Sequence, residues 1–175
     1  MSQEHALSPP PSLAEKIAAP IRKINGYILT VLAFLLVGCV VWQVVSRYTA
    51  ARPSTVTDEL ARFTFMWIGL LGAAQASAHK KHLAIDLLAM KLKGKAKLVL
   101  NVLIECCIIA FASLVMIKGG WELTAKTFAN QQVTPALQWP MGYIYMIVPI
   151  AGILMVFFSL VAITENFSAR AGGAA

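Results

Sequence analysis

Long apolar segments are the feature that most constrains how this chain can fold. Four of them, separated by polar or charged stretches, cover residues 27–46, 60–78, 98–117 and 141–163. A helix needs about 20 mostly apolar residues to cross the hydrocarbon core of a bilayer. The second segment reaches that length only when Leu60 and Ala61 are included. Because main-chain polar groups in lipid must be hydrogen-bonded within the protein, the segments predict an all-α integral membrane four-helix bundle.

The composition excludes several other classes of protein. The chain is 58% hydrophobic and 13% charged, whereas a soluble globular chain is about 25% charged. A chain of 175 residues cannot hide so much apolar surface in one core. This excludes a soluble enzyme, a disordered tail and a disulfide-stapled secreted module. We expect a cytoplasmic tail and arm at 1–26, a membrane domain at 27–163 and a cytoplasmic tail at 164–175.

The Lys and Arg residues are unevenly divided between the two sides that four spans define. Ten of the 15 lie in the N-terminal arm, in the connection between the second and third segments, or in the C-terminal tail. The cytoplasmic loops of membrane proteins carry an excess of Lys and Arg. We therefore expect both termini in the cytoplasm, with the loops at 47–59 and 118–140 facing outward.

Two segments outside the spans have the pattern of helices that lie on the membrane surface. Ser12 and Glu15 match a capping box, and apolar residues then recur at helical spacing as far as Ile24. This predicts an N-terminal amphipathic arm helix, which Pro20 should bend or restart. Residues 82–92 predict an interfacial cytoplasmic helix between spans two and three. The alternative for both is an ordinary helix packed on a neighbouring protein.

Glu105 and Asn101 are polar residues one turn apart within the third predicted span. An ionisable group in a span is costly, so it raises the hypothesis of a proton- or cation-coupling carboxylate. The alternative is a neutral or hydrogen-bonded Glu that ties helices together. We favour the structural role, because no intramembrane Lys, Arg, Asp or His is available to pair with this carboxylate. Gln43 and Gln75 are candidate hydrogen-bond partners.

The second segment contains two pairs of small residues four positions apart. They are Gly69 with Ala73 and Gly72 with Ala76. Such pairs let two helices approach closely in a membrane. They fit packing within this protein and contact with a partner equally well.

Charged and aromatic residues near the ends of the segments are candidate contacts for partners or lipids. They are Arg47, Arg52, Asp58, Glu59, Arg62, Trp67, Lys80 and Lys81. Acidic residues at a helix start favour the macrodipole, and the same charges offer an outward surface to a soluble partner. Lys80 and Lys81 would attract anionic lipid headgroups. No catalytic, substrate-binding or metal-ligating motif is recognisable, so we predict no enzyme activity and no cofactor.

A series of short motifs resembles a known family. In chain order they are Arg47-Tyr48, Asp58-Glu59-Leu60-Ala61-Arg62, Trp67, Gly69, Gly72-Ala73-Ala74, His82-Leu83-Ala84-Ile85-Asp86, Thr134-Pro135-Ala136-Leu137, Pro140, Tyr145 and Pro149. Their order and spacing over residues 20–165 resemble the small membrane subunit of the tripartite ATP-independent periplasmic (TRAP) transporters, the DctQ-like family. Val56-Thr57 departs from the aromatic residue that this family often has before the acidic pair.

The resemblance implies an accessory subunit of a sodium-coupled transporter in the bacterial inner membrane. Its partners would be a large, DctM-like membrane subunit that carries substrate and sodium, a periplasmic substrate-binding protein, and membrane lipids; nucleic acid is not among them. The substrate would be an organic acid of the dicarboxylate or sialic acid type. The small subunit would act as a scaffold, would help to dock the binding protein, and would itself hold no substrate or sodium ligand.

Two other functions compete with this one. The first is a self-sufficient small cation-coupled exporter that uses Glu105. The second is a membrane anchor for a soluble enzyme, which the lack of haem or quinone-type ligands disfavours.

Overall fold

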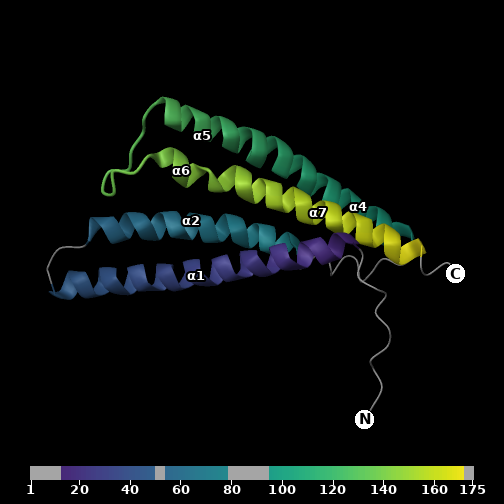
Figure 1. Ribbon diagram of the computed structural model, residues 1–175, viewed down its shortest axis with the longest axis horizontal. Coiled ribbons are helices and arrows are strands. Elements are labelled where there is room, and N and C mark those ends of the chain that lie inside the picture. The colour runs from purple at the N-terminus through teal and green to yellow at the C-terminus, as the bar shows by residue number, and fades with distance from the viewer. Residues whose placement is uncertain (1–12, 50–53, 79–94, 172–175) are drawn as a thin grey trace, which may run out of the picture.

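The computed structural model describes the main chain of residues 13–49, 54–78 and 95–171, and the side chains within residues 16–49, 54–78 and 99–164. Every named element in these ranges is a helix (Figure 1). The chain forms α1 (Leu13–Thr49), α2 (Thr55–Ala78), α4 (Lys95–Phe111), the π-helix η1 (Ala112–Gly119), α5 (Gly120–Ala129), α6 (Met141–Tyr145) and α7 (Ile147–Ala171). The predicted all-helical fold is therefore confirmed for the described residues.

Three helical stretches are long and apolar enough to cross a membrane. They are Lys16–Thr49, Val99–Ala129 and Met141–Thr164. The helix α2 is not among them, since Arg62 and Gln75 stand among its apolar residues. The count of four spans and their limits therefore stay predictions.

The arm and the first predicted span form one continuous helix. The 37 residues of α1 include Pro20, and the helix continues on both sides of it. Of the two outcomes expected at Pro20, a restart of the helix is therefore wrong, and a bend stays a prediction. Pro20 is the eighth residue of α1, and its missing N–H removes one main-chain hydrogen bond from a helix of 37 residues. The predicted interfacial helix at 82–92 lies outside the described residues.

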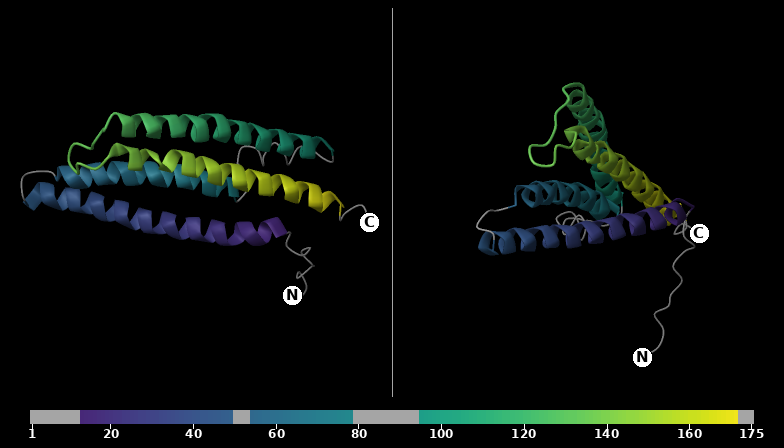
Figure 2. Two further views of the ribbon diagram at one scale, coloured as in Figure 1. Left: turned by 45° about the horizontal axis from the view of Figure 1, so that its top comes forward. Right: turned by 60° about the vertical axis from the view of Figure 1, so that its left-hand side comes forward.

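The helices form two hairpins that meet along one seam. One hairpin pairs α1 with α2, and the other pairs the run α4–η1–α5 with α6 and α7 (Figure 1). The seam lies between α2 and α7, and α4 has no extended contact with α1 or α2. The described helices thus form an open arrangement, in which the hairpins splay apart at one end (Figure 2). We call this the loop end, because it carries residues 130–140; the opposite end is the terminal end.

Small residues set the close packing around the seam. Ala112, Met116 and Ala151 form a buried cluster, against which Leu70 and Val148 pack with neighbouring side chains. A Cβ added to Gly152 would lie 2.8 Å from the Cβ of Met116. The π-helix and α7 therefore approach as closely as their main chains allow.

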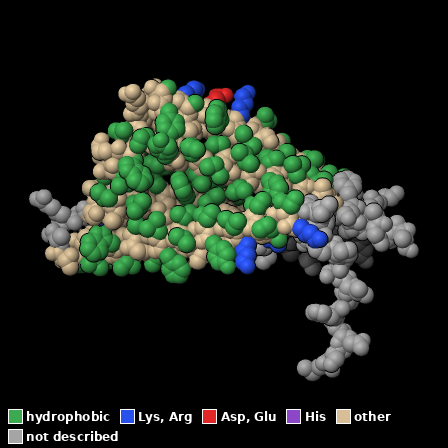
Figure 3. All heavy atoms as spheres, in the orientation of Figure 1, with side chains coloured by type: hydrophobic (Ala, Val, Ile, Leu, Met, Phe, Trp, Pro, Cys, Tyr) green, Lys and Arg blue, Asp and Glu red, His purple; other side chains and the backbone are tan. Residues whose placement is uncertain are grey.

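Most of the apolar surface is not buried within the chain. In the most apolar window of α1, only 6% of the residues are buried in the protein. Hydrophobic side chains cover much of the visible face (Figure 3). Exposed apolar surface on this scale marks contact with lipid or with a partner protein.

Candidate functional site

The first turn of α2 is fixed by its own sequence. The Ser54 carbonyl accepts hydrogen bonds from the N–H of Asp58, at 3.2 Å, and from the Thr57 hydroxyl, at 3.1 Å. Thr57 N also lies 3.5 Å from the Ser54 hydroxyl oxygen. This arrangement starts the helix at Thr55 and sets the direction of Glu59.

Glu59 joins the two hairpins at the loop end. Its Oε2 accepts hydrogen bonds from the N–H of Ala136 at 3.0 Å and from the N–H of Leu137 at 2.8 Å. Hydrogen bonds to an ionised acceptor are about twice as strong as neutral ones. We call this contact between Glu59, Ala136 and Leu137 the latch. It brings together two of the sequence motifs, which lie 77 and 78 residues apart along the chain.

The loop that carries the latch has an ordered turn of its own. Thr134 is fully buried, and its N–H donates to the Trp139 carbonyl at 2.8 Å. The Thr134 hydroxyl oxygen accepts from the N–H of Trp139 at 3.1 Å. Gln131 and Gln138 have positive φ angles of 48° and 55°. Non-glycine residues adopt this conformation at a cost, which the surrounding hydrogen bonds offset.

Aromatic contacts extend this junction toward the seam. The indole N–H of Trp67 donates to the Ile144 carbonyl at 3.1 Å. Phe128 and Tyr143 meet edge to face, with ring centroids 5.1 Å apart. A Cβ on Gly142 would lie 2.5 Å from the Phe128 ring, so only glycine fits there without a shift. Trp67 was expected near a span end as a candidate contact for partners or lipids; its indole N–H also joins α2 to α6.

The other charged candidates near the loop end remain accessible. Arg62 and Asp58 form an ion pair at 2.8 Å, with side chains 76% and 51% exposed. Arg47, in the last turn of α1, is exposed. Arg52, Lys80 and Lys81 lie outside the described residues. A role for these residues in contact with partners or lipids stays a prediction, and the Glu59 carboxylate has an internal task in addition.

The small residues of α2 leave a face open. Gly69, Ala73 and Ala76 are exposed, in line with Phe65. A Cβ added to Gly69 or Gly72 would meet no atom within 4 Å. Other residues of α2 are turned toward the rest of the protein: Leu70 packs against the cluster that includes Ala151 of α7, and Leu71 and Ala74 are buried. Of the two predicted uses of these pairs, packing within the described part of this chain is not the one observed.

The polar residues predicted inside the membrane are not joined to one another. Glu105 is buried and Asn101 is half-buried on α4, and no hydrogen bond or ion pair joins either of them to another described residue. Gln43 donates to the Thr57 carbonyl at 2.9 Å, and Gln75 bonds to α1, so these amides are not the partners of Glu105. No group of three or more His, Cys, Asp or Glu residues within the described ranges is placed to hold a metal ion.

Sequence reasoning missed one polar residue. Asn25 is buried on α1, and its Nδ2 donates to the Gln75 Oε1 at 2.8 Å and to the Leu71 carbonyl at 3.2 Å. The Gln75 Nε2 donates to the Arg22 carbonyl at 3.2 Å. Asn25 precedes the first apolar segment, and an amide at helical register with Ile21 and Ile28 was the available signal.

Comparison with known proteins decides the family. Residues 36–169 match the family of tripartite ATP-independent periplasmic transporters, DctQ component. The chain belongs to this DctQ family. Its members are transporter subunits rather than enzymes, and the chain is a small membrane permease subunit of a TRAP transporter.

Named relatives agree with this assignment. The chain is 28% identical to the sialic acid TRAP transporter small permease protein SiaQ of Vibrio cholerae, over 80% of this chain and 79% of that protein. It is 29% identical to a putative TRAP transporter small permease protein of Haemophilus influenzae, over 81% and 80% of the two chains. It is 25% identical to the isethionate TRAP transporter permease protein DctMQ of Oleidesulfovibrio alaskensis, over 62% of this chain and 17% of that one. The last relative joins both subunit types in one polypeptide, so the family works with a DctM-type large subunit.

Proposed function

We propose that this subunit is a scaffold that braces a DctM-like large subunit in a sodium-coupled transporter of organic acids. The substrate is an acid of the sialic acid or dicarboxylate type, and substrate and sodium are held by the large subunit. The protein lies in the bacterial inner membrane with four spans and both termini in the cytoplasm. The loop end then faces the periplasm and helps to dock the substrate-binding protein.

The open face of α2 is the observation that carries this proposal. Lipid chains gain little from small side chains, whereas a partner helix can pack closely against them. Gly69 and Ala73 present such a surface, and no side chain in the described ranges covers it. A permanent partner helix on this face would account for residues that internal packing does not use.

The open arrangement of the helices supports a scaffold role rather than a transport path through this subunit. Because α4 has no extended contact with α1 or α2, these helices do not close around a common axis. The described hydrogen bonds of Asn25, Gln43 and Gln75 join neighbouring helices and do not form a continuous polar path. A subunit built in this way widens the fixed part of a transporter whose moving part lies elsewhere.

Co-purification with the large subunit tests the scaffold proposal. The tagged chain is co-expressed with its DctM-type partner and isolated in a mild detergent. We expect wild type to retain the partner, and Gly69→Leu to lower retention about tenfold, within the range expected for overpacking an interface. The matched control is Gly38→Leu on α1, since a Cβ at Gly38 also meets nothing within 4 Å. Clean separation of the wild-type subunits would contradict the proposal.

Charge reversal at the loop end tests the docking role. Asp58→Lys removes the acidic partner of Arg62, and it leaves the Glu59 latch in place. We expect weaker uptake by the full transporter, and a loss that varies with ionic strength because salt screens exposed charges. The control Glu122→Lys makes the same charge change on an exposed residue of α5. Equal uptake by wild type and Asp58→Lys at every salt concentration would remove this role.

A further inference from the structure

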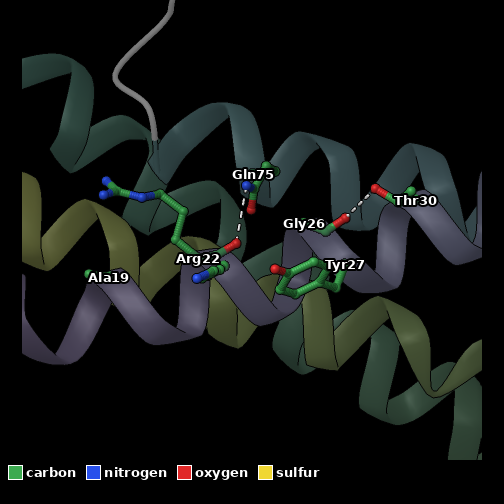
Figure 4. Close-up of a pocket in the computed structure, with 7 residues that line it drawn as sticks. Ala19, Arg22, Gly26, Tyr27, Thr30 and Gln75 are labelled. Atoms are coloured by element: carbon green, nitrogen blue, oxygen red, sulfur yellow. Dashed lines mark hydrogen bonds between the residues drawn. The ribbon is translucent and has the colours of Figure 1, made fainter.

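The terminal end of the α1–α2 hairpin carries an open groove with a basic rim. Its volume is about 560 Å³. It is lined by one face of α1 and by one residue of α2 (Figure 4). The lining residues are Ala19, Arg22, Lys23, Gly26, Tyr27, Thr30 and Gln75. We propose that this groove binds the phosphate headgroup of an anionic phospholipid.

The floor of the groove is held in place by hydrogen bonds. Gln75 donates to the main-chain carbonyl of Arg22 at 3.2 Å (Figure 4). Its Oε1 accepts from the Asn25 Nδ2, at 2.8 Å. The Thr30 hydroxyl donates to the Gly26 carbonyl at 2.9 Å. The two helices are therefore fixed at this level before any ligand binds, and a ligand need not order them.

The charge of the groove has one sign. Arg22 is half-buried and Lys23 is exposed, and no carboxylate is among the lining residues. Neither side chain has an ion-pair partner in the part of the chain that the structure describes. A guanidinium presents paired donors that match phosphate oxygens, and an ammonium adds a second positive charge. The Tyr27 hydroxyl supplies a further donor on the same face.

The position of the groove selects a lipid over a soluble anion. Arg22 and Lys23 lie one turn before the apolar segment that starts at Tyr27, which is the level of lipid headgroups in a spanning helix. Further along α1, Val31 and Phe34 are exposed, at 67% and 75%. A phosphate bound at the groove would thus have its acyl chains beside exposed apolar side chains of the same helix.

Lipid binding to the purified full-length chain tests the proposal. Fluorescent phosphatidylglycerol and phosphatidylcholine are titrated into the protein in a neutral detergent. We expect tighter binding of phosphatidylglycerol. Arg22→Gln and Lys23→Gln should each weaken that binding about fivefold, the effect of one basic residue near an anionic surface. The matched control is Lys16→Gln, an exposed residue of α1 outside the groove, which should change binding by less than about twofold.

A steric variant separates a seated headgroup from diffuse attraction. Ala19→Phe fills the groove and leaves its charge unchanged, so it should also weaken phosphatidylglycerol binding severalfold. Gln75 bonds to the main chain of Arg22, so all variants should keep the helix content of wild type by circular dichroism. Equal binding of the two lipids, or full binding by Ala19→Phe, would overturn the proposal. Displacement of phosphatidylglycerol by millimolar glycerol phosphate would also overturn it, since the site would then take a soluble anion.

Discussion

The two ends of α2 are joined to their neighbours by different chemistry. At the loop end, the Glu59 carboxylate accepts two main-chain hydrogen bonds from a loop. At the terminal end, the neutral amides of Asn25 and Gln75 bond to each other and to main-chain carbonyls. The desolvation cost of a charged group is small where water is near, whereas neutral amides cost less than charges to bury among apolar helices. The stronger link, between the two hairpins, therefore lies at the loop end, where the hairpins splay. The weaker link, between α1 and α2 of one hairpin, lies at the terminal end.

The largest effect is expected from removing the charged link. Glu59→Ala leaves the N–H groups of Ala136 and Leu137 without their acceptor, and each lost hydrogen bond to a charged group costs about 1.5–3 kcal/mol. Because Glu59 is half-buried, we expect the free energy of unfolding to fall by about 3 kcal/mol. Denaturant unfolding in mixed micelles measures this loss, and faster hydrogen exchange at both amides locates it.

The control for this variant is Glu122→Ala, which removes an exposed carboxylate from the first turn of α5. It should change stability by less than about 0.5 kcal/mol. Equal effects of the two variants would show that the latch contributes no more than an average surface charge.

Glycine-to-alanine substitutions sharpen the comparison, because we expect them to change stability in opposite directions at the two ends. Gly142→Ala pushes a Cβ to 2.5 Å from the Phe128 ring, and such overpacking costs about 1–3 kcal/mol. Gly26→Ala places its Cβ 3.5 Å from the Gln75 amide nitrogen, an ordinary contact, and should gain up to about 1 kcal/mol from helix propensity. Thermal unfolding of both variants checks the signs. Equal shifts in the same direction would contradict this difference in packing.

The neutral link should give a smaller loss than the charged one. Asn25→Leu removes the donor to Gln75 and to the Leu71 carbonyl, and we expect a cost of about 1 kcal/mol, since hydrogen bonds between membrane helices average about 0.6 kcal/mol. A double-mutant cycle with Gln75→Leu gives the pairwise part. A loss larger than that of Glu59→Ala would reverse the order of the two links.

The smallest effect is expected at the exposed ion pair beside the latch. Asp58→Asn breaks its contact with Arg62, and exposed pairs of this kind contribute about 0.3–0.5 kcal/mol. The difference in unfolding free energy should vanish at high salt. A salt-independent loss above about 1 kcal/mol would mean that Asp58 stabilises the first turn of α2 in another way.

The sequence predicted the helices well because apolar runs are a local signal. The segment at 27–46 lies within α1, and the segment at 98–117 lies within the run of α4 and η1. The segment at 141–163 covers α6 and most of α7, with a turn at Met146 between them. Their limits were less predictable, since hydropathy marks the part in lipid and not the helix. Thus α1 extends back through Pro20 to Leu13, and the helix that starts at Lys95 continues to Ala129.

The latch could not be placed from the sequence, because it is a tertiary contact. The motifs at Asp58-Glu59 and Thr134-Pro135-Ala136-Leu137 were recognised, and their order matched the family. Nothing local indicated that the Glu59 carboxylate turns toward main-chain N–H groups 77 residues further along. The small pairs in α2 were likewise visible in the sequence, but only the structure shows that the space beside Gly69 and Gly72 is open.

Solute flux in reconstituted vesicles tests most directly the claim that this subunit supports a transporter and is not one itself. Vesicles with the chain alone are compared with vesicles that also contain the DctM-type subunit and the substrate-binding protein, under a sodium gradient. We predict uptake of the organic acid in the complete system and none above the empty-vesicle rate with the chain alone. Uptake through the chain alone, abolished by Glu105→Gln, would contradict the account.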